Sequence, residues 1–356
     1  MEWPVAAGHP VAINVPDVSP ADDSFTELAR DRVAWIGLSG LPGNMIERHM
    51  PGLRLSRYRA ALQAALAARA GRFVVTHLPR MSAVTAQALR LLRRRVPHLA
   101  FSFNFTDLPT GRPRQFLGEA LRGVDQFAVF SRFEAALYAR HFDLDPARFV
   151  PTIWTQAPPV PQAGPGLAPG APYVCAVGGE GRDFATLLAA AVRIGPALRI
   201  VVIARRHSLA GLCVPDHVEV LTELPAPRCW RIAMDSMGVL VPLRTRETCC
   251  GQVTLVGAKL LGIPIATTRS DATVDYCAGR EAVLESEPGD PAAFAGLIER
   301  LAADHARLRA AARRAVPAER ALHDPAHWAD YLRAFVARHV EPAQALPAQP
   351  SMSVSP

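Results

Sequence analysis

The segment 237–268 reads MGVLVPLRTRETCCGQVTLVGAKLLGIPIATT and contains one complete unit of the predicted fold. An apolar run at 237–243 has the composition of a short strand, and a polar loop follows it. A helical pattern begins near Gly251 and leads directly into a second β-rich run at 263–268. A strand, a helix and a strand in this order predict a right-handed crossover between two parallel strands of one sheet.

The same alternation extends through the chain on both sides of this unit. In the C-terminal half it begins at YVCAV, 173–177, and in the N-terminal half apolar runs at 33–38, 73–77, 98–105 and 125–131 are separated by helical patterns. Between the halves lies APPVPQAGPGLAPGAP, whose six prolines and three glycines are incompatible with a helix or a central strand. The sequence therefore predicts an α/β protein with two doubly wound Rossmann-like domains that face a cleft at the carboxyl ends of their strands.

The chain length fits two domains of roughly 150 to 180 residues each. The predicted segments are an irregular N-terminal arm at 1–30, an acceptor-side domain at 31–156, a linker at 157–172, a donor-binding domain at 173–320, a C-terminal helix at 321–340 that packs back across the cleft, and a flexible tail at 341–356.

Composition restricts where the protein works. No apolar run reaches the roughly 20 residues of a membrane span, and the N-terminus has acids and prolines in place of a signal peptide, so we expect a cytoplasmic protein. The six cysteines include no CxxC pair and fit reduced, buried thiols; for Cys249 and Cys250 plain packing is favoured over a metal or redox site.

The net charge of +7 comes almost wholly from arginine. One helical segment contains a cluster that could contact anionic lipid headgroups, although a solvated helix face explains it equally well: Arg90, Arg93, Arg94 and Arg95. Because arginine usage can follow from a GC-rich genome, the charge does not predict a nucleic-acid partner.

Three loops that follow strands in the C-terminal half carry the candidate chemistry. VGGEGRDF, 177–184, has glycines that let backbone N–H groups approach an anion and a basic residue, Arg182, although it could be a plain turn. Its glycine spacing does not match GxGxxG, so no nicotinamide or flavin cofactor is expected. In 240–252, the N–H groups of Gly251, Gln252 and Val253 form a second anion seat, and Glu247 could accept bonds from ribose hydroxyls or form an ordinary ion pair.

The third loop is TTRSDATVDY, 267–276, in which Asp271 more simply caps a short helix. In order, the loops resemble the C-terminal domain of the GT-B nucleotide-sugar glycosyltransferases of the family 4 type. The similarity covers most of 173–315 and rests on VGGEGRDFATLLAAA, VPLRTRETCCGQVTLVGAKLLGIPIATTRSDATVDY and LESEPGDPAAFAGLIERL. SGLPGN, FNFTDLP and the stretch beginning DQFAVFS resemble the N-terminal domain more weakly.

The resemblance implies transfer of a sugar from a nucleoside diphosphate sugar to a glycan or lipid-linked acceptor, usually with retention and without an essential metal or cofactor. The pathway it implies is the assembly of surface polysaccharide or glycolipid at the inner face of the membrane. The implied roles are donor binding by Gly40, Gly43, Gly179, Arg182, Arg205, Glu247, Gly251, Gln252 and Val253; acceptor-side contacts by His77, Asn104 and Asp107; and catalysis by Asp107 and Glu247. Lys259, two turns into its helix, is expected to be structural.

Two positions depart from the family pattern. Members carry two glutamates eight positions apart, and here these positions hold Cys249 and Gly257, with Glu247 as the nearest substitute for the first. The second glutamate is thought to hold the donor ribose. Two alternatives therefore stand beside an active transferase: a GT-B-like pseudoenzyme that only binds, and a GT-B sugar-nucleotide epimerase.

Overall fold

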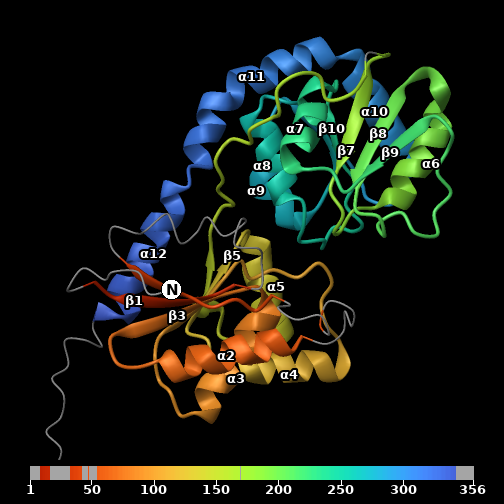
Figure 1. The fold of residues 1–356 in the computed structure, drawn as a ribbon. Helices are drawn as coiled ribbons and strands as arrows, with labels where there is room; N and C mark the ends of the chain where they lie inside the picture. Colours follow the sequence, from red (N-terminus) through yellow and green to blue (C-terminus); the bar gives the residue numbers. More distant parts are fainter. Residues whose placement is uncertain (1–8, 17–32, 42–46, 48–53, 169, 342–356) are drawn as a thin grey trace, which may run out of the picture.

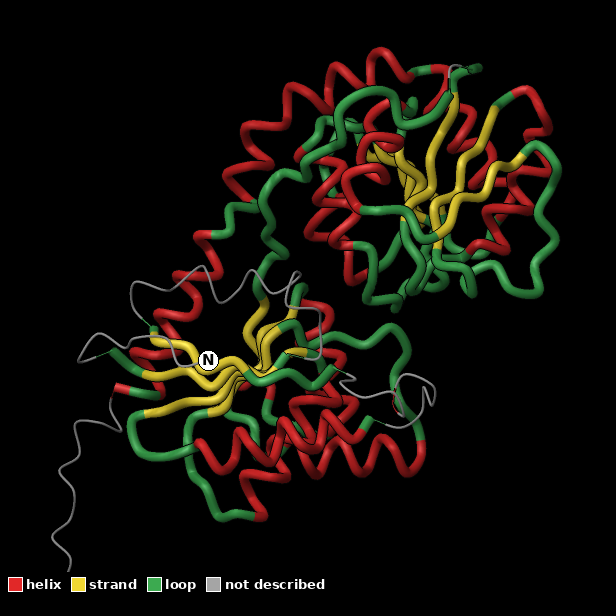
Figure 2. Tube along the Cα trace, viewed as in Figure 1, coloured by secondary structure: helices red, strands yellow, loops and turns green. Residues whose placement is uncertain are grey.

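The computed structural model describes residues 9–16, 33–41, 47, 54–168 and 170–341. They form two α/β domains, each built on a six-stranded sheet with only parallel neighbours (Figures 1 and 2). The predicted fold class is confirmed.

The N-terminal sheet has the order β2-β1-β3-β4-β5-β6. Its strands are β1 (Val11–Val15), β2 (Ala34–Gly37), β3 (Arg72–His77), β4 (His98–Phe101), β5 (Gln126–Val129) and β6 (Phe149–Pro151). Its helices are α2 (Leu55–Ala67), α3 (Pro79–Leu91), α4 (Gly111–Leu121) and α5 (Arg132–Phe142).

The prediction of an irregular arm over 1–30 is wrong at 11–15. Strand β1 lies inside the sheet between β2 and β3, and Ile13 and Val15 are fully buried. The run VAINV is short and no helical pattern is visible before the next strand, so the sequence lacks the alternation that revealed the other strands. Hydrogen bonding on both sides, which is tertiary, makes it a central strand.

The C-terminal sheet has the order β12-β11-β10-β7-β8-β9. Its strands are β7 (Tyr173–Val177), β8 (Arg199–Ala204), β9 (Val218–Thr222), β10 (Val239–Val241), β11 (Ile265–Thr268) and β12 (Val283–Ser286). The helices that cover it are α6 (Phe184–Ile194), α7 (Ala226–Asp235), α8 (Gln252–Leu260), α9 (Val274–Cys277) and α10 (Pro291–Ala303). Short 3₁₀ turns occur at Pro146–Arg148, Gly195–Ala197 and Asp271–Thr273.

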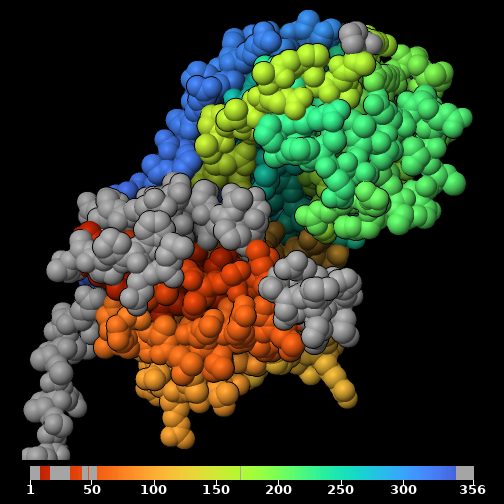
Figure 3. All heavy atoms as spheres, in the orientation of Figure 1, coloured from red at the N-terminus to blue at the C-terminus, as the bar shows by residue number. Residues whose placement is uncertain are grey.

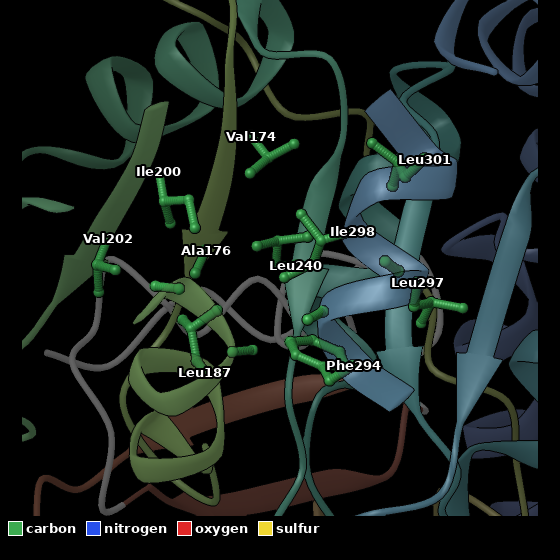
Figure 4. Close-up of a cluster of buried hydrophobic side chains, with 14 of the residues drawn as sticks. Val174, Ala176, Leu187, Ile200, Val202, Leu240, Phe294, Leu297, Ile298 and Leu301 are labelled. Carbon is green, nitrogen blue, oxygen red and sulfur yellow. The ribbon is translucent and has the colours of Figure 1, made fainter. Parts of the chain in front are cut away.

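Each sheet is buried on both faces, as parallel sheets require. On one face of the C-terminal sheet, Val174, Ile200 and Leu240 pack against α6 and α10 (Figure 4). The opposite face packs against α7, α8 and α9 through alternate residues such as Val239 and Val241. Because successive strand side chains point to opposite faces, continuous apolar runs produce both layers.

Two connections join the domains. One is the linker, whose described residues form no helix or strand, and the other is helix α11 (His305–Leu322), which leads into α12 (Ala326–His339) (Figures 1 and 3). Helix α12 returns to the N-terminal domain, where Trp328, Leu332 and Phe335 pack on the sheet with Phe73 and Phe101. No helix among the described residues is long and apolar enough to cross a bilayer. The predicted tail, apart from Glu341, lies outside the described residues.

Candidate functional site

The loop after β7 is shaped by glycines that no other residue could replace without strain. Gly178 and Gly181 have φ of +126° and +67°, in the left-handed region that favours glycine. A Cβ on Gly178 would lie 2.8 Å from the guanidinium of Arg182, and one on Gly181 would lie 2.8 Å from Cβ of Cys250. The glycines therefore let this loop wrap closely around Arg182 and reach the loop after β10.

Arg182 is a partly buried cation with only neutral partners. Its guanidinium donates to the carbonyl oxygens of Val177 and Glu180, at 3.4 and 3.3 Å, and to Oγ1 of Thr254 at 3.0 Å. No carboxylate among the described residues pairs with it. Burial lowers the pKa of Arg182 to about 10, the nearby Cys250 acting in the opposite direction. A desolvated positive charge without a counterion is suited to receive an anion.

The amino end of α8 lies beside this cation. Thr254, which accepts from Arg182, belongs to the first turn of α8, and Gly251 caps the helix with φ of +104°. Gln252 is only 5% exposed, and its buried side-chain amide nitrogen has no hydrogen-bond partner among the described atoms. The backbone N–H groups of the first turn and the helix dipole thus lie beside a guanidinium, and the same turn contains the buried amide of Gln252.

The two cysteines connect this place to the N-terminal domain. Cys250 donates from Sγ to Oγ1 of Thr106 at 3.5 Å, and the carbonyl of Cys249 accepts from Nδ2 of Asn104 at 3.5 Å. Cys249 is itself buried among residues of the N-terminal core. Packing therefore accounts for both thiols, as the sequence favoured.

A cavity of about 210 Å³ lies between the domains next to these contacts. It is lined by Asp107 and Tyr138 from the N-terminal domain and by Arg244, Glu247 and Cys249 from the C-terminal domain. Both oxygens of the Asp107 carboxylate accept from Arg244 across the boundary, at 2.8 and 2.9 Å. Glu247 is exposed, so its carboxylate can accept from a ligand. The structure therefore brings Asp107 and Glu247 together across the domain boundary, and Asn104 lies next to them through its bond to the carbonyl of Cys249.

Three other predicted residues, His77, Gly179 and Arg205, do not line this cavity. His77 is buried at the end of β3, and its Nε2 lies 2.9 Å from Oδ1 of Asn14 on β1. This contact holds the ring against the neighbouring strand and not in the cavity. Arg205 forms an exposed ion pair with Glu180 at 2.7 Å, which makes it a weaker anion ligand than Arg182. Gly179 lies against this pair, since its Cβ would be 3.4 Å from Cγ of Arg205.

The loop after β2 is only partly described. Gly40 is buried; its N–H donates to the carbonyl of Pro16, and its own carbonyl accepts from Oγ of Ser56 at 3.1 Å. Gly43 lies outside the described residues. Val253, in the first turn of α8, has an exposed side chain.

One buried acid next to the cavity was not predicted. Glu134, in the first turn of α5, accepts from the N–H of Phe130 and the hydroxyls of Ser131 and Tyr138 at 3.0 to 3.2 Å. Burial raises the pKa of Glu134 to about 8, although these hydrogen bonds act in the opposite direction. The spacing Ser131-x-x-Glu134 is a capping-box signal that could have located the residue but not its burial.

The two positions where glutamates are missing are filled in different ways. Gly257 packs against the ring of Trp230 on α7, so closely that a Cβ would lie 2.2 Å from the indole. Cys249 is buried at the domain boundary. A glutamate fits neither place without rearrangement, so the departures are built into the packing.

The arginine cluster lies on the N-terminal domain, at the end of α3. It lines an open hollow of about 730 Å³ that also includes Asp125 and His339. Arg90 pairs with Glu119 at 2.9 Å, whereas Arg93, Arg94 and Arg95 form no ion pair with a described residue.

Comparisons with known proteins support the fold. No protein-family model and no curated sequence matches the chain. Anabaena HepE in complex with UDP-glucose is similar in structure, with a TM-score of 0.71, 13% identity, and coverage of 92% of this chain and 100% of that one. Sucrose-phosphate synthase from Thermosynechococcus elongatus has a TM-score of 0.68 and 16% identity, again covering 92% and 100%. The lipopolysaccharide outer core galactosyltransferase WaaB has a TM-score of 0.60 and 11% identity, covering 92% and 99%.

The chain thus has the GT-B architecture of nucleotide-sugar glycosyltransferases over nearly its whole described length. At these identities the likeness establishes the fold, and the residues of the cleft must carry any argument about activity.

Proposed function

We propose that the protein is a glycosyltransferase that moves a sugar from a nucleoside diphosphate sugar to an acceptor hydroxyl. The observation that carries the proposal is the uncompensated guanidinium of Arg182 beside the amino end of α8 and the unpartnered amide of Gln252. In glycosyl transfer the bond between the sugar carbon and the diphosphate breaks and its electron pair moves to the leaving diphosphate. A fixed cation and oriented N–H groups stabilise that growing charge most where water is excluded.

The protein's own groups supply this positive charge, so we propose that neither a metal nor an organic cofactor is essential. The roles of Gly251, Gln252 and Val253 follow from their place at the cap and in the first turn of α8, which lies beside the guanidinium. Activity that survives exhaustive chelation supports this part of the proposal, and activity restored only by a divalent cation contradicts it.

On the acceptor side, Asp107 and Glu247 line the interdomain cavity, and Asn104 lies next to it through its bond to the carbonyl of Cys249. We propose that their oxygens and amide orient the acceptor hydroxyl and that Asp107 or Glu247 assists its deprotonation. Because Asp107 is engaged by Arg244, the acceptor must share or displace that exposed ion pair, which is worth under about 1 kcal/mol. The acceptor class favoured is a glycan or lipid-linked saccharide used in surface polysaccharide or glycolipid assembly, with retention of configuration.

The location we propose is the cytoplasmic face of a membrane, with Arg93, Arg94 and Arg95 near the lipid. Their lack of partners within the described chain and their common hollow support this placement. Basic residues near an anionic bilayer contribute about 1 kcal/mol each.

The testing experiment is a thermal melt of the purified protein with UDP, GDP, ADP and TDP and with their sugars. A ligand present at about 100 times its dissociation constant stabilises by roughly 2.7 kcal/mol, which a melt detects. If the nucleotides of one base raise the melting temperature more than the others do, that base identifies the donor. The acceptor screen then uses the corresponding sugar nucleotide. A folded protein that responds to none of them contradicts the proposal.

The packing of Gly257 against Trp230 favours one other candidate, a GT-B-like protein that binds a sugar nucleotide without turnover. One measurement, the release of nucleoside diphosphate, distinguishes the two candidates. A transferase releases nucleoside diphosphate in the presence of acceptor, whereas a binding protein shows the melt shift without release.

A further inference from the structure

A cavity of about 320 Å³ lies in the C-terminal domain between helix α11 and the sheet. Helix α11 packs on α8 along this side of the domain (Figure 1). Pockets that bind small molecules in proteins have volumes of about 300 to 1,000 Å³, and they combine an apolar lining with a few polar groups. The volume of this cavity therefore suits a small ligand.

The cavity lies at the edge of the sheet opposite to the cleft. Its lining includes Ile265 and Val283, which are the first residues of β11 and β12. Arg280 and Glu281, in the connection that enters β12, line it as well. Donor ligands of open α/β sheets bind at the carboxyl ends of the strands, where the Arg182 loop lies. A ligand in this cavity would therefore be neither the sugar donor nor the acceptor.

The wall of the cavity is largely apolar, and small residues on α11 keep it open. Ala311, Ala312 and Ala315 have the spacing i, i+1 and i+4, so they share one face of the helix. Longer side chains at these positions would fill the space between α11 and the sheet. The apolar lining consists of Ile263, Ile265, Val283, Ala311, Ala312 and Ala315. Such a wall suits the hydrocarbon part of a ligand.

Two guanidinium groups at the rim of the cavity have free donors. Arg280 donates from Nε to Glu319 at 2.8 Å and from Nη1 to the carbonyl of Ala278 at 3.0 Å. Its Nη2 has no hydrogen-bond partner among the described residues. Arg314 is exposed and donates from Nη2 to Glu281 at 3.3 Å, which leaves its Nη1 free with respect to the described part of the chain. Each arginine can therefore still donate to a ligand.

The charges that line the cavity do not balance. Three cations, Lys259, Arg280 and Arg314, stand against the two acids Glu281 and Glu319. Lys259 directs its three hydrogen bonds to other protein groups, so its donors are already used. The excess of one positive charge is therefore presented by the two arginines, and one anionic group would compensate it.

We propose that this cavity is a binding site for a small organic anion, a carboxylate or a phosphate monoester with a short apolar body. The body packs on the alanine face of α11, and the anionic group accepts from Arg280 and Arg314. The buried side of the site is the pair of Lys259 and Glu319, which contacts the carbonyl of Trp154 through His323. The ligand thus lies against the connection between the domains.

The test titrates the full-length protein with four ligands that share a six-carbon body, using ligand-detected NMR to obtain dissociation constants. Hexanoate and hexyl phosphate have the proposed anionic group, hexanol has no charge, and hexylammonium has the opposite charge. We expect each anion to bind at least about 10-fold more tightly than hexanol, because a charge-assisted hydrogen bond is worth that much. Whichever anion binds more tightly identifies the anionic group.

Two pairs of variants locate the ligand. Ala315→Leu adds a larger apolar side chain to the wall, and its matched control Ala310→Leu makes the same change at an exposed position of α11 outside the lining. Arg314→Gln removes one cation of the rim. Its matched control is Arg307→Gln, since Arg307 pairs with the same Glu281 at 3.0 Å but does not line the cavity.

Ala315→Leu should weaken binding of the anions at least about 10-fold by occupying their space, and Arg314→Gln should weaken it at least about 3-fold. Both controls should retain the wild-type affinity. A wild type that binds neither anion overturns the proposal, as does equal binding of hexanoate and hexanol. Unchanged affinity in both Ala315→Leu and Arg314→Gln would place the ligand elsewhere. UDP should not displace hexanoate, and displacement would assign the anion to the Arg182 site instead. Melting with nucleotides alone, on the same samples, tests the donor site independently.

Discussion

Two cations of the C-terminal domain, Lys259, which is buried, and Arg182, which is partly buried, have opposite surroundings. Lys259, the only lysine, lies on α8 and donates to Glu319 at 2.8 Å, to Nε2 of His323 at 2.9 Å and to the carbonyl of Tyr276. Arg182, in the loop after β7, contacts Thr254 in the first turn of the same helix and hydrogen-bonds only to neutral oxygens. The difference separates a charge that stabilises the fold from a charge that is available to bind a ligand.

The lysine network joins the connections between the domains. Glu319 and His323 lie at the end of α11, and Nδ1 of His323 is 2.7 Å from the carbonyl of Trp154, where the chain leaves the N-terminal domain. Burial would raise the pKa of Glu319, but His323, Lys259 and Arg280 outweigh it and hold that pKa at about 2. A cation with so many partners has no capacity left for a ligand, in agreement with the structural role expected from the sequence.

The largest effect that separates the two cations is on stability. Lys259→Ala leaves the buried carboxylate of Glu319 short of one partner, so the free energy of unfolding should fall by about 3 to 5 kcal/mol. Urea denaturation measures it. Arg182→Ala removes a cation that has no counterion and should cost less than about 1 kcal/mol in the same experiment. Equal losses in the two variants would remove the distinction between them.

The next effect is on activity and reverses the order. Arg182→Ala should lower turnover at least about 100-fold, because one fixed group that stabilises the leaving charge is worth that much. Arg193→Ala, at an exposed position of α6, serves as the control for the loss of one arginine and should retain wild-type turnover. Assays with a saturating donor measure both. Full activity in Arg182→Ala contradicts the assignment of the anion seat.

The third effect sharpens the contrast on the other side of the cleft, where Glu134 is a buried acid that burial keeps protonated. Its folded pKa of about 8 exceeds the ordinary value of 4.5, so the unfolded chain binds fewer protons between these pH values. Stability must therefore fall as pH rises from 4.5 to 8, by roughly 1 to 3 kcal/mol from this group. Glu134→Gln, which keeps the neutral hydrogen bonds, should flatten that part of the profile. An unchanged slope in the variant would show that Glu134 is ionised in the fold.

The smallest effect concerns the exposed pair across the cleft. Arg244→Gln removes the partner of Asp107, whose side chain is 74% exposed, and should change stability by less than about 1 kcal/mol. If the acceptor displaces this pair, the variant should lower KM for the acceptor while KM for the donor stays constant. Steady-state kinetics with each substrate varied in turn measures this. A change confined to the donor KM would place Arg244 with the donor instead.

The fold was predictable because its signal is local and repeated. Most strands from β3 onward are apolar runs bounded by turns and followed by a helical pattern, so periodicity indicates two parallel sheets. Strand β1 was missed because VAINV has no such repeat around it. The site was predictable in part for the same reason, since the glycine loop and the start of α8 follow strands and carry visible turn signals.

What sequence reasoning missed depends on contacts between distant segments. Arg182 could be named from its loop, but the lack of a counterion becomes evident only when Thr254, 72 positions away, is seen as its partner. His77 was a reasonable candidate until Asn14, on the unpredicted strand, was found to hold its ring. The burial of Glu134 likewise depends on the packing of Cys249 from the other domain against the same cluster.

The most direct test of the central claim asks whether Arg182 recognises the diphosphate. Calorimetric titration should compare a nucleoside diphosphate with the monophosphate of the same base, in wild type and in Arg182→Gln. We predict that the second phosphate strengthens binding by at least about 10-fold in the wild type, equivalent to about 1.4 kcal/mol. In Arg182→Gln that gain should shrink to less than about 2-fold while the monophosphate affinity stays nearly constant. The same gain in both proteins would contradict the claim that this unpaired cation is the seat of the diphosphate.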